Sequence, residues 1–139
     1  MKRTVKCPQG KESRPRRVLT RDEQKAFLET AYGTSNYNQY AFLLQTGLRT
    51  GEMIGLKWSD IDFNSGIISI SRSMEYRHSV KKWRIGPTKS KSGVREIPMT
   101  AECKRILLDQ KRKVKELKTV NLQFADFVFH LDIPMQLDV

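Results

Sequence analysis

The chain has 139 residues, of which 38% are hydrophobic and 29% are charged, so it can form one hydrophobic core and lacks the composition of a disordered protein. Its 26 Lys and Arg residues outnumber its 15 Asp and Glu residues, and the net charge of +11 favours a polyanionic partner such as nucleic acid. No stretch approaches the roughly 18 apolar residues that span a bilayer, so membrane insertion and export are not expected.

The chain contains two cysteines, Cys7 and Cys103, which lie far apart in the sequence. Neither belongs to a Cys-x-x-Cys motif or lies beside a pair of histidines, so the sequence predicts no metal site and no disulfide framework. Reduced thiols are typical of cytoplasmic proteins. We therefore expect a cytoplasmic protein.

Residues 1–17 form a basic segment with seven Lys and Arg residues and one acid, a net charge of +6. Pro8, Gly10 and Pro15 interrupt any periodicity, which predicts a flexible linker, with one domain over residues 18–139. Two interpretations of the linker remain open. It is either a solvated tail or a segment that lies along a phosphate backbone.

Three helices are predicted in the first part of the domain. Thr20 and Glu23 have the spacing of a capping box, which predicts a helix that runs to about Ala31. A second, buried helix is predicted from Tyr37 until Gly47 ends it, and a short third helix over 49–56. The inner faces are expected to be formed by Phe27, Leu28 and Ala31 in the first helix and by Tyr37, Tyr40, Ala41 and Leu44 in the second.

A small three-stranded antiparallel sheet is predicted after the third helix. Ile68 and Ile70 alternate with serines in its first strand, residues 80–85 are expected to pair with that strand, and residues 94–99 supply the third. Thr100 is then expected to cap a long helix. Its inner face is predicted to contain Cys103, Ile106, Leu107, Val114 and Leu117. The fold class is therefore α+β, a helical bundle packed with a small sheet.

Two segments carry a specific resemblance. Residues 43–62 read LLQTGLRTGEMIGLKWSDID and closely resemble the first signature box of the tyrosine recombinases of the phage-integrase type. Residues 88–99 read TKSKSGVREIPM and resemble the lysine-bearing β-hairpin of that family with its Arg-x-Ile-Pro ending. The resemblance covers about residues 14–130. Two boxes in the family order and at the family separation make a coincidence improbable.

The resemblance implies part of a tyrosine-recombinase catalytic domain. Such an enzyme cuts and rejoins double-stranded DNA at specific sites through a 3′-phosphotyrosyl intermediate, with neither a metal nor another cofactor, and the full-length protein is expected to assemble as a tetramer on DNA. The chemistry agrees with this implication. Opening a phosphodiester requires charge neutralisation on the non-bridging oxygens and a proton for the departing 5′ oxygen, and side chains can supply both.

The resemblance also implies roles for individual residues. Arg49 matches the first catalytic arginine, whose planar fork can hold two phosphate oxygens, and Glu52 matches the acid that supports it. An arginine paired with Glu52 on a helix surface, and an ordinary surface acid, are the respective alternatives. The family lysine acts as general acid towards the 5′ oxygen. Counting six residues back from Arg95 selects Lys89 for this role, whereas a shorter turn selects Lys91.

Residues 71–95 carry eight Lys and Arg residues against Glu75 alone, a net charge of +7, which predicts a surface that faces DNA. Whether Trp83 lies on this surface or in the core remains open. The candidate DNA-binding residues, in addition to the lysines above, are Arg72, Arg77, Lys81, Lys82, Arg84 and Arg95.

The chain departs from the family pattern after the hairpin. It has no His-x-x-Arg box, because His130 is followed by Leu131, Asp132 and Ile133, and the last tyrosine is Tyr76. We therefore expect His130 to be structural and the chain to be the first half of a catalytic domain, inactive alone. The alternatives are a non-catalytic DNA-binding remnant of an integrase and a basic RNA-binding protein with a coincidental arginine box.

Overall fold

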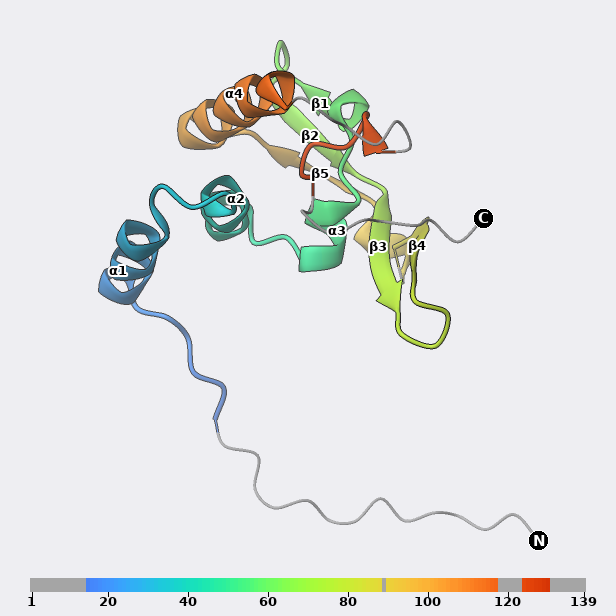
Figure 1. The fold of residues 1–139 in the computed structure, drawn as a ribbon, viewed down its shortest axis with the longest axis horizontal. Helices are drawn as coiled ribbons and strands as arrows, with labels where there is room; N and C mark the ends of the chain where they lie inside the picture. Colours follow the sequence, from blue (N-terminus) through green and yellow to red (C-terminus); the bar gives the residue numbers. More distant parts are fainter. Residues whose placement is uncertain (1–14, 89, 118–123, 131–139) are drawn as a thin grey trace, which may run out of the picture.

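The computed structural model describes residues 15–88, 90–117 and 124–130. Almost all of the predicted basic linker lies outside these ranges, so its boundary with the domain stays a prediction. The described helices are α1 (Arg21–Ala31), α2 (Tyr37–Thr46), α3 (Thr50–Ile54) and α4 (Ala101–Glu116). Two small antiparallel sheets lie between α3 and α4 in the sequence, which gives the mixed α+β architecture of Figure 1.

The predicted ends of the first two helices are confirmed. The Thr20 hydroxyl accepts a hydrogen bond from the Glu23 amide at 3.2 Å, and the Thr20 amide donates to the Glu23 carboxylate at 2.9 Å, so the capping box is complete. Gly47 ends α2 in the left-handed region at φ 65°, where glycine carries no steric penalty.

The predicted inner face of this helix pair is wrong at two positions. The exposed fractions of Phe27 and Tyr40 are 43% and 37%, and their rings meet edge to face at 5.1 Å near the surface. In Figure 1, α1 lies at the edge of the molecule beside α2, far from the sheets. Because no described element covers the outer flank of this pair, helical spacing alone does not bury these rings.

Helix α4 packs against α2, and the Thr100 hydroxyl caps it by accepting from the Cys103 amide at 3.1 Å, as predicted. Cys103, Ile106 and Leu107 are buried. Leu117 was also predicted to face inward, but it is 49% exposed. The helix ends at Glu116, so Leu117 lies beyond the last turn that faces the core.

The predicted strands exist, but one of them has a different partner. Strands β1 (Ile61–Asp62), β2 (Ile67–Ile70) and β5 (Arg95–Pro98) form a three-stranded antiparallel sheet in the order β1-β2-β5. Residues 80–85 were expected to pair with β2. Instead β4 (Lys82–Pro87) pairs with β3 (Arg72–Arg77) in a separate two-stranded hairpin. The tight turn before β4 closes a short loop, which costs less chain entropy than pairing with the more distant β2.

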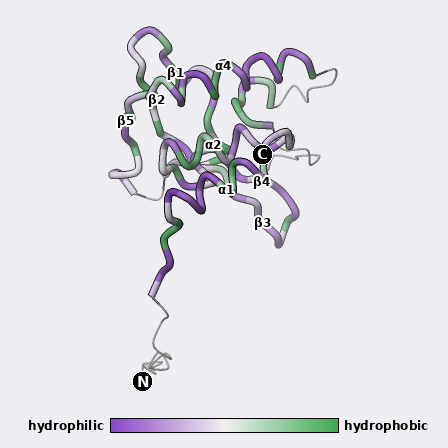
Figure 2. Tube along the Cα trace, turned by 90° about the vertical axis from the view of Figure 1, so that its left-hand side faces the viewer, coloured by the Kyte–Doolittle hydropathy of each residue, from purple (hydrophilic) through white to green (hydrophobic). Residues whose placement is uncertain are grey.

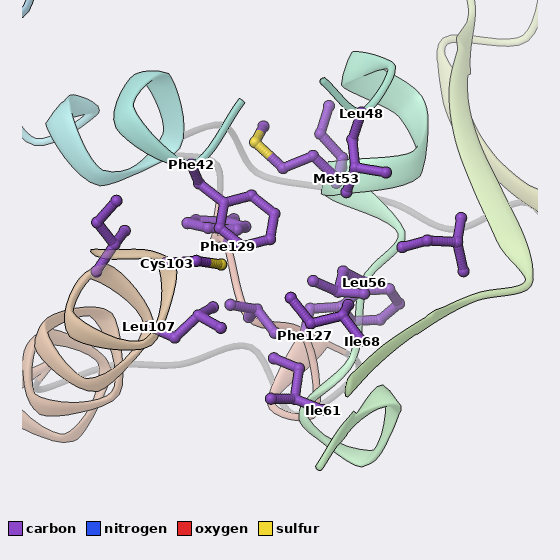
Figure 3. Close-up of a cluster of buried hydrophobic side chains, with 14 of the residues drawn as sticks. Phe42, Leu48, Met53, Leu56, Ile61, Ile68, Cys103, Leu107, Phe127 and Phe129 are labelled. Carbon is purple, nitrogen blue, oxygen red and sulfur yellow. The ribbon is translucent and has the colours of Figure 1, made fainter. Parts of the chain in front are cut away.

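The core lies where α2, α3 and α4 meet β2 (Figure 3). Residues 124–129 fill its centre, because Phe124, Phe127, Val128 and Phe129 are all buried. Two backbone hydrogen bonds of 2.9 and 3.0 Å, from Trp58 N to Asp126 O and from Val128 N to Leu56 O, fasten this segment beside α3. Hydrophilic residues occupy much of α4 and of the β3–β4 hairpin (Figure 2). The core thus anchors α3, which begins directly after the predicted catalytic arginine.

Candidate active site

Arg49 lies on a rigid stretch of backbone. It follows the left-handed Gly47 and the buried Leu48, and it is the residue immediately before α3. The Arg49 amide donates to the Glu52 carboxylate at 3.0 Å. In contrast, its side chain is 82% exposed. The guanidinium therefore projects from a fixed point and is accessible to an anion.

Glu52 is the buried centre of this site, with an exposed fraction of 2%. Arg95 donates to both carboxylate oxygens, from Nη1 at 3.1 Å and from Nη2 at 3.0 Å, in a two-pronged ion pair. Arg49 Nη1 lies farther away, at 3.4 Å. The hydrogen bonds from Arg95 lower the pKa of Glu52 below its ordinary value of 4.5, aided by the Arg49 amide and opposed by burial.

These contacts decide between the two interpretations of Glu52. An ordinary acid on a helix surface is largely exposed to water, whereas this carboxylate is buried and accepts three hydrogen bonds of 3.0–3.1 Å. The surface-acid alternative is therefore wrong. The geometry is that of a group that organises the arginines around it.

A polar pocket of about 320 Å³ opens in front of Arg49. It is lined by Gly47, Arg49, Ser90, Ser92, Gly93 and Arg95. The two serine hydroxyl oxygens lie 2.9 Å apart, so the loop after β4 contributes hydroxyl groups opposite the guanidinium. A guanidinium and hydroxyl donors around one opening are a suitable environment for a phosphate group.

Of the two candidate lysines, the structure describes only Lys91, on the loop whose Ser90, Ser92 and Gly93 form one wall of this pocket. Lys91 begins a short 3-10 turn (Lys91–Gly93) and is exposed. Lys89 lies outside the described residues, between Thr88 and Ser90. The choice between the two lysines therefore stays a prediction.

Of the six arginines and lysines predicted to bind DNA, five lie on the β3–β4 hairpin, and four of these lie beyond Arg72, its first residue. These four are Arg77, Lys81, Lys82 and Arg84. Arg84 lies 3.7 Å from Glu75, and both side chains are more than half exposed. On the same hairpin, the Trp83 ring is half-buried at the edge of the core and packs against Tyr76 at 5.3 Å. Trp83 therefore contributes to the core side of the hairpin.

The other two, Arg72 and Arg95, are held by carboxylates inside the domain. Arg72 forms an ion pair with Asp60, whose side chain is only 12% exposed, and this pair ties β3 to the turn that precedes β1. Arg95 is held by Glu52. Sequence reasoning missed both pairs, because the partners are 12 and 43 residues apart and no local spacing reveals them.

Other features of the described ranges bear on the site only indirectly. His130 is half-buried, and burial lowers its pKa, so its imidazole is neutral at pH 7. Within residues 15–88, 90–117 and 124–130, no cluster of three or more His, Cys, Asp or Glu side chains is placed to hold a metal ion. None of the helices in these ranges is long and apolar enough to cross a membrane.

We predict that Glu52→Gln lowers the free energy of unfolding by about 2 kcal/mol at pH 7, because a hydrogen-bonded ion pair with a buried carboxylate is lost. The lowered pKa of Glu52 means that its stabilising effect is complete above the ordinary pKa of 4.5 and disappears as the pH falls through the lower folded value. Urea denaturation from pH 7 to pH 3 measures both effects.

The matched control is Glu75→Gln, which removes an exposed carboxylate 3.7 Å from Arg84 and is expected to change stability by less than about 0.5 kcal/mol. Equal losses in the two variants would contradict the central role of Glu52. So would a loss in Glu52→Gln that does not diminish at low pH.

Comparisons with known proteins agree with this geometry. Residues 17–129 match the model of the phage integrase family. The transposase of transposon Tn916 from Enterococcus faecalis is 32% identical over 124 residues, which cover 83% of this chain and 29% of that protein. The prophage integrase IntR of Escherichia coli K12 is 29% identical over 92 residues, which cover 66% of this chain and 21% of IntR.

Solved structures show the same fold. The integrase of transposon Tn1549, in complex with transposon right end DNA, superposes with a TM-score of 0.72 and 29% identity over 87% of this chain and 40% of that chain. The XerA recombinase superposes with a TM-score of 0.62 and 25% identity over 95% of this chain and 40% of that chain. The chain thus spans less than half the length of these relatives. It belongs to the phage integrase family, the tyrosine recombinases.

Proposed function

We propose that the chain is part of a site-specific tyrosine recombinase that cuts and rejoins double-stranded DNA through a 3′-phosphotyrosyl intermediate. The observation that carries this proposal is the exposed Arg49 guanidinium, which lies beside the buried Glu52 carboxylate and lines a polar pocket. Family membership and the DNA complexes of the Tn1549 integrase support the assignment. We expect the full-length enzyme to act as a tetramer on DNA.

In the proposed reaction, a tyrosine oxygen attacks the phosphorus and the bond from phosphorus to the 5′ oxygen breaks. Arg49 holds two non-bridging oxygens while negative charge redistributes over them. Lys89 gives a proton to the departing 5′ oxygen, with Lys91 as the alternative donor. Since the sequence has no tyrosine after Tyr76, the nucleophile is supplied from outside these 139 residues. In this proposal, side chains alone neutralise the charge on the phosphate oxygens and protonate the departing 5′ oxygen.

A second candidate function, which the basic β3–β4 hairpin would also serve, is DNA binding without catalysis. A non-catalytic remnant of an integrase would keep the basic surface and merely occupy DNA. The sequence encoded immediately downstream of Val139 distinguishes the two, because an intact gene contains a His-x-x-Arg box and a late tyrosine there. A stop codon directly after Val139 would favour the remnant.

We predict that residues 1–139 alone form no covalent adduct with DNA, however well they hold a phosphate, because no route to the phosphotyrosyl intermediate exists without the nucleophile. A suicide substrate with a nick near the cleavage site traps such adducts, which are visible on a denaturing gel. A trapped adduct would mean that one of the four early tyrosines is the nucleophile.

For DNA binding, we propose that the β3–β4 hairpin contributes phosphate contacts through Arg77, Lys81, Lys82 and Arg84. We predict that duplex affinity falls steeply between about 50 and 200 mM salt, and that Lys81→Gln with Lys82→Gln reduces the slope of log K against log salt by about 2. Fluorescence anisotropy with a random duplex measures the slope.

The matched control for the hairpin variant is Lys104→Gln with Lys115→Gln, which removes the same charge from exposed positions on α4. We expect it to leave the slope nearly unchanged. If both double variants reduce the slope equally, the hairpin is not the preferred DNA surface. Affinity that does not respond to salt would contradict phosphate binding altogether.

We predict that Arg49→Ala and Arg49→Lys, in the full-length protein, retain nearly normal duplex binding and lose cleavage by about two orders of magnitude or more. One phosphate contact among many is a small part of the affinity. Lysine keeps the charge but lacks the planar fork that holds two oxygens. Cleavage by Arg49→Lys at the wild-type rate would refute the role of the fork.

A further prediction separates the two lysines. Replacing the 5′ bridging oxygen of the substrate by sulfur gives a leaving group that needs no proton. We expect this substrate to restore cleavage to Lys89→Ala and not to Arg49→Ala. If sulfur restores Lys91→Ala instead, Lys91 is the general acid, and if it restores Arg49→Ala as well, the roles of arginine and lysine are wrongly divided.

A further inference from the structure

Arg95 connects three parts of the candidate site through one guanidinium. It begins β5, directly after the loop that carries both candidate lysines. Nη1 and Nη2 bind the Glu52 carboxylate of α3 at 3.1 and 3.0 Å, and Nη1 also donates to the carbonyl oxygen of Gly93 in the loop at 3.0 Å. The lysine-bearing loop is therefore fastened to the element that follows Arg49.

The loop that precedes Arg95 is itself tightly folded around Gly93. A Cβ atom on Gly93 would lie 2.5 Å from Thr88 Cβ, so the two ends of the loop touch and only glycine fits there. The Thr88 hydroxyl donates to the Ser90 carbonyl at 3.0 Å, and the Gly93 and Val94 amides donate to the carbonyls of Ser90 and Lys91 at 2.9 and 3.2 Å. Holding Gly93 therefore restrains Thr88, Ser90 and Lys91, with which it is in contact or joined through this turn.

The charges at Glu52 are divided unequally between the two arginines. Arg95 makes two short bonds to the carboxylate and its side chain is 34% exposed, whereas Arg49 makes one long contact and its side chain is 82% exposed. Since Arg95 compensates the buried negative charge, Arg49 keeps most of its own charge for an anion outside. A phosphate would have to compete with Glu52 for the fork of Arg95.

We propose that Arg95 is a positioning residue, which holds the general-acid loop against Glu52 and leaves Arg49 available to the phosphate. This inference rests on the proposed recombinase function and gives Arg95 a role other than the direct DNA contact expected from the sequence. Arg95 acts through the lysine and through Arg49; although it lines the pocket, its Nη1 and Nη2 atoms are bound to Glu52 and to the Gly93 carbonyl.

The first test uses residues 1–139 and needs no catalysis. Arg95→Lys keeps a positive charge beside the buried Glu52 carboxylate, which preserves the fold, but a single ammonium cannot bind both carboxylate oxygens and the Gly93 carbonyl together. We expect amide exchange at Gly93 and Val94, measured by NMR, to accelerate about tenfold or more, while exchange at Ile68 in β2 is unchanged.

Arg84→Lys is the matched control, because Arg84 is also a strand arginine paired with a glutamate, but its partner is the exposed Glu75 and not the buried Glu52. It is expected to leave exchange at Gly93 and Val94 as in the wild type. Unchanged exchange in Arg95→Lys would overturn the proposal that Arg95 restrains the loop, whatever the function of the protein.

The second test uses the full-length protein and two substrates. We expect Arg95→Lys to bind duplex DNA normally, to cleave an ordinary substrate about a hundredfold more slowly, and to recover most of the rate with the 5′ bridging sulfur substrate, because a misplaced general acid is then no longer needed. A normal rate would overturn the positioning role, and a slow rate that sulfur does not restore would overturn the part of it that acts through the general acid. Normal cleavage by Arg49→Ala would contradict the proposed function itself, whatever the result for Arg95→Lys.

Discussion

The ion pair between the buried Glu52 carboxylate and Arg95 is the interaction on which the arrangement of the site depends. Glu52 is on α3, a helix of only five residues, which is too short to be stable in isolation. A carboxylate buried to this extent would be strongly unfavourable without a partner, and the fork of Arg95 provides one. The pair therefore couples the position of α3, and with it Arg49, to the start of β5.

Close backbone packing restricts α3 from its other side. A Cβ atom on Gly51 would lie 2.6 Å from the Ser73 hydroxyl and 2.8 Å from the Met74 carbonyl oxygen, so α3 rests directly on β3. The same strand is held at its start by the ion pair between Arg72 and Asp60. A residue larger than glycine at position 51 would push the basic hairpin away from α3. The candidate DNA surface and the candidate catalytic arginine thus share one rigid support.

The parts of this structure that the sequence predicted are those set by local signals. The spacing of Thr20 and Glu23, the glycine at position 47 and Thr100 before α4 each specify a helix end within three or four residues of chain. The predicted inner faces of α1, α2 and α4 were each wrong at one position, and the pairing of β4 was wrong, because burial and pairing depend on what covers each element. Helical or alternating periodicity identifies an apolar face but not its partner.

The resemblance located Arg49 and Glu52, yet it could not give the contacts that define their roles. From the sequence alone, Glu52 could also be an ordinary surface acid. The hydrogen bonds from Arg95, 43 residues later, exclude that alternative. The net charge similarly could not show which of the basic residues lie exposed at the surface and which are bound inside the domain. Arg72 and Arg95 contribute to the +7 of residues 71–95, but both are bound to carboxylates inside the domain.

That distribution of charge explains how residues 71–95 can both hold the buried Glu52 and present positive charge at the surface. An arginine whose fork is filled by a buried carboxylate adds little to the field felt by a polyanion, because the pair is nearly neutral outside the site. An exposed arginine or lysine keeps its full charge, subject only to screening by salt. Because Arg95 satisfies Glu52, the accessible positive charge of residues 71–95 that the structure describes lies on the hairpin and at Lys91, and Arg49 adds its own. In the proposed function, a phosphate backbone drawn to the hairpin would then meet, at the pocket, an arginine whose backbone is held by Glu52 before the phosphate arrives.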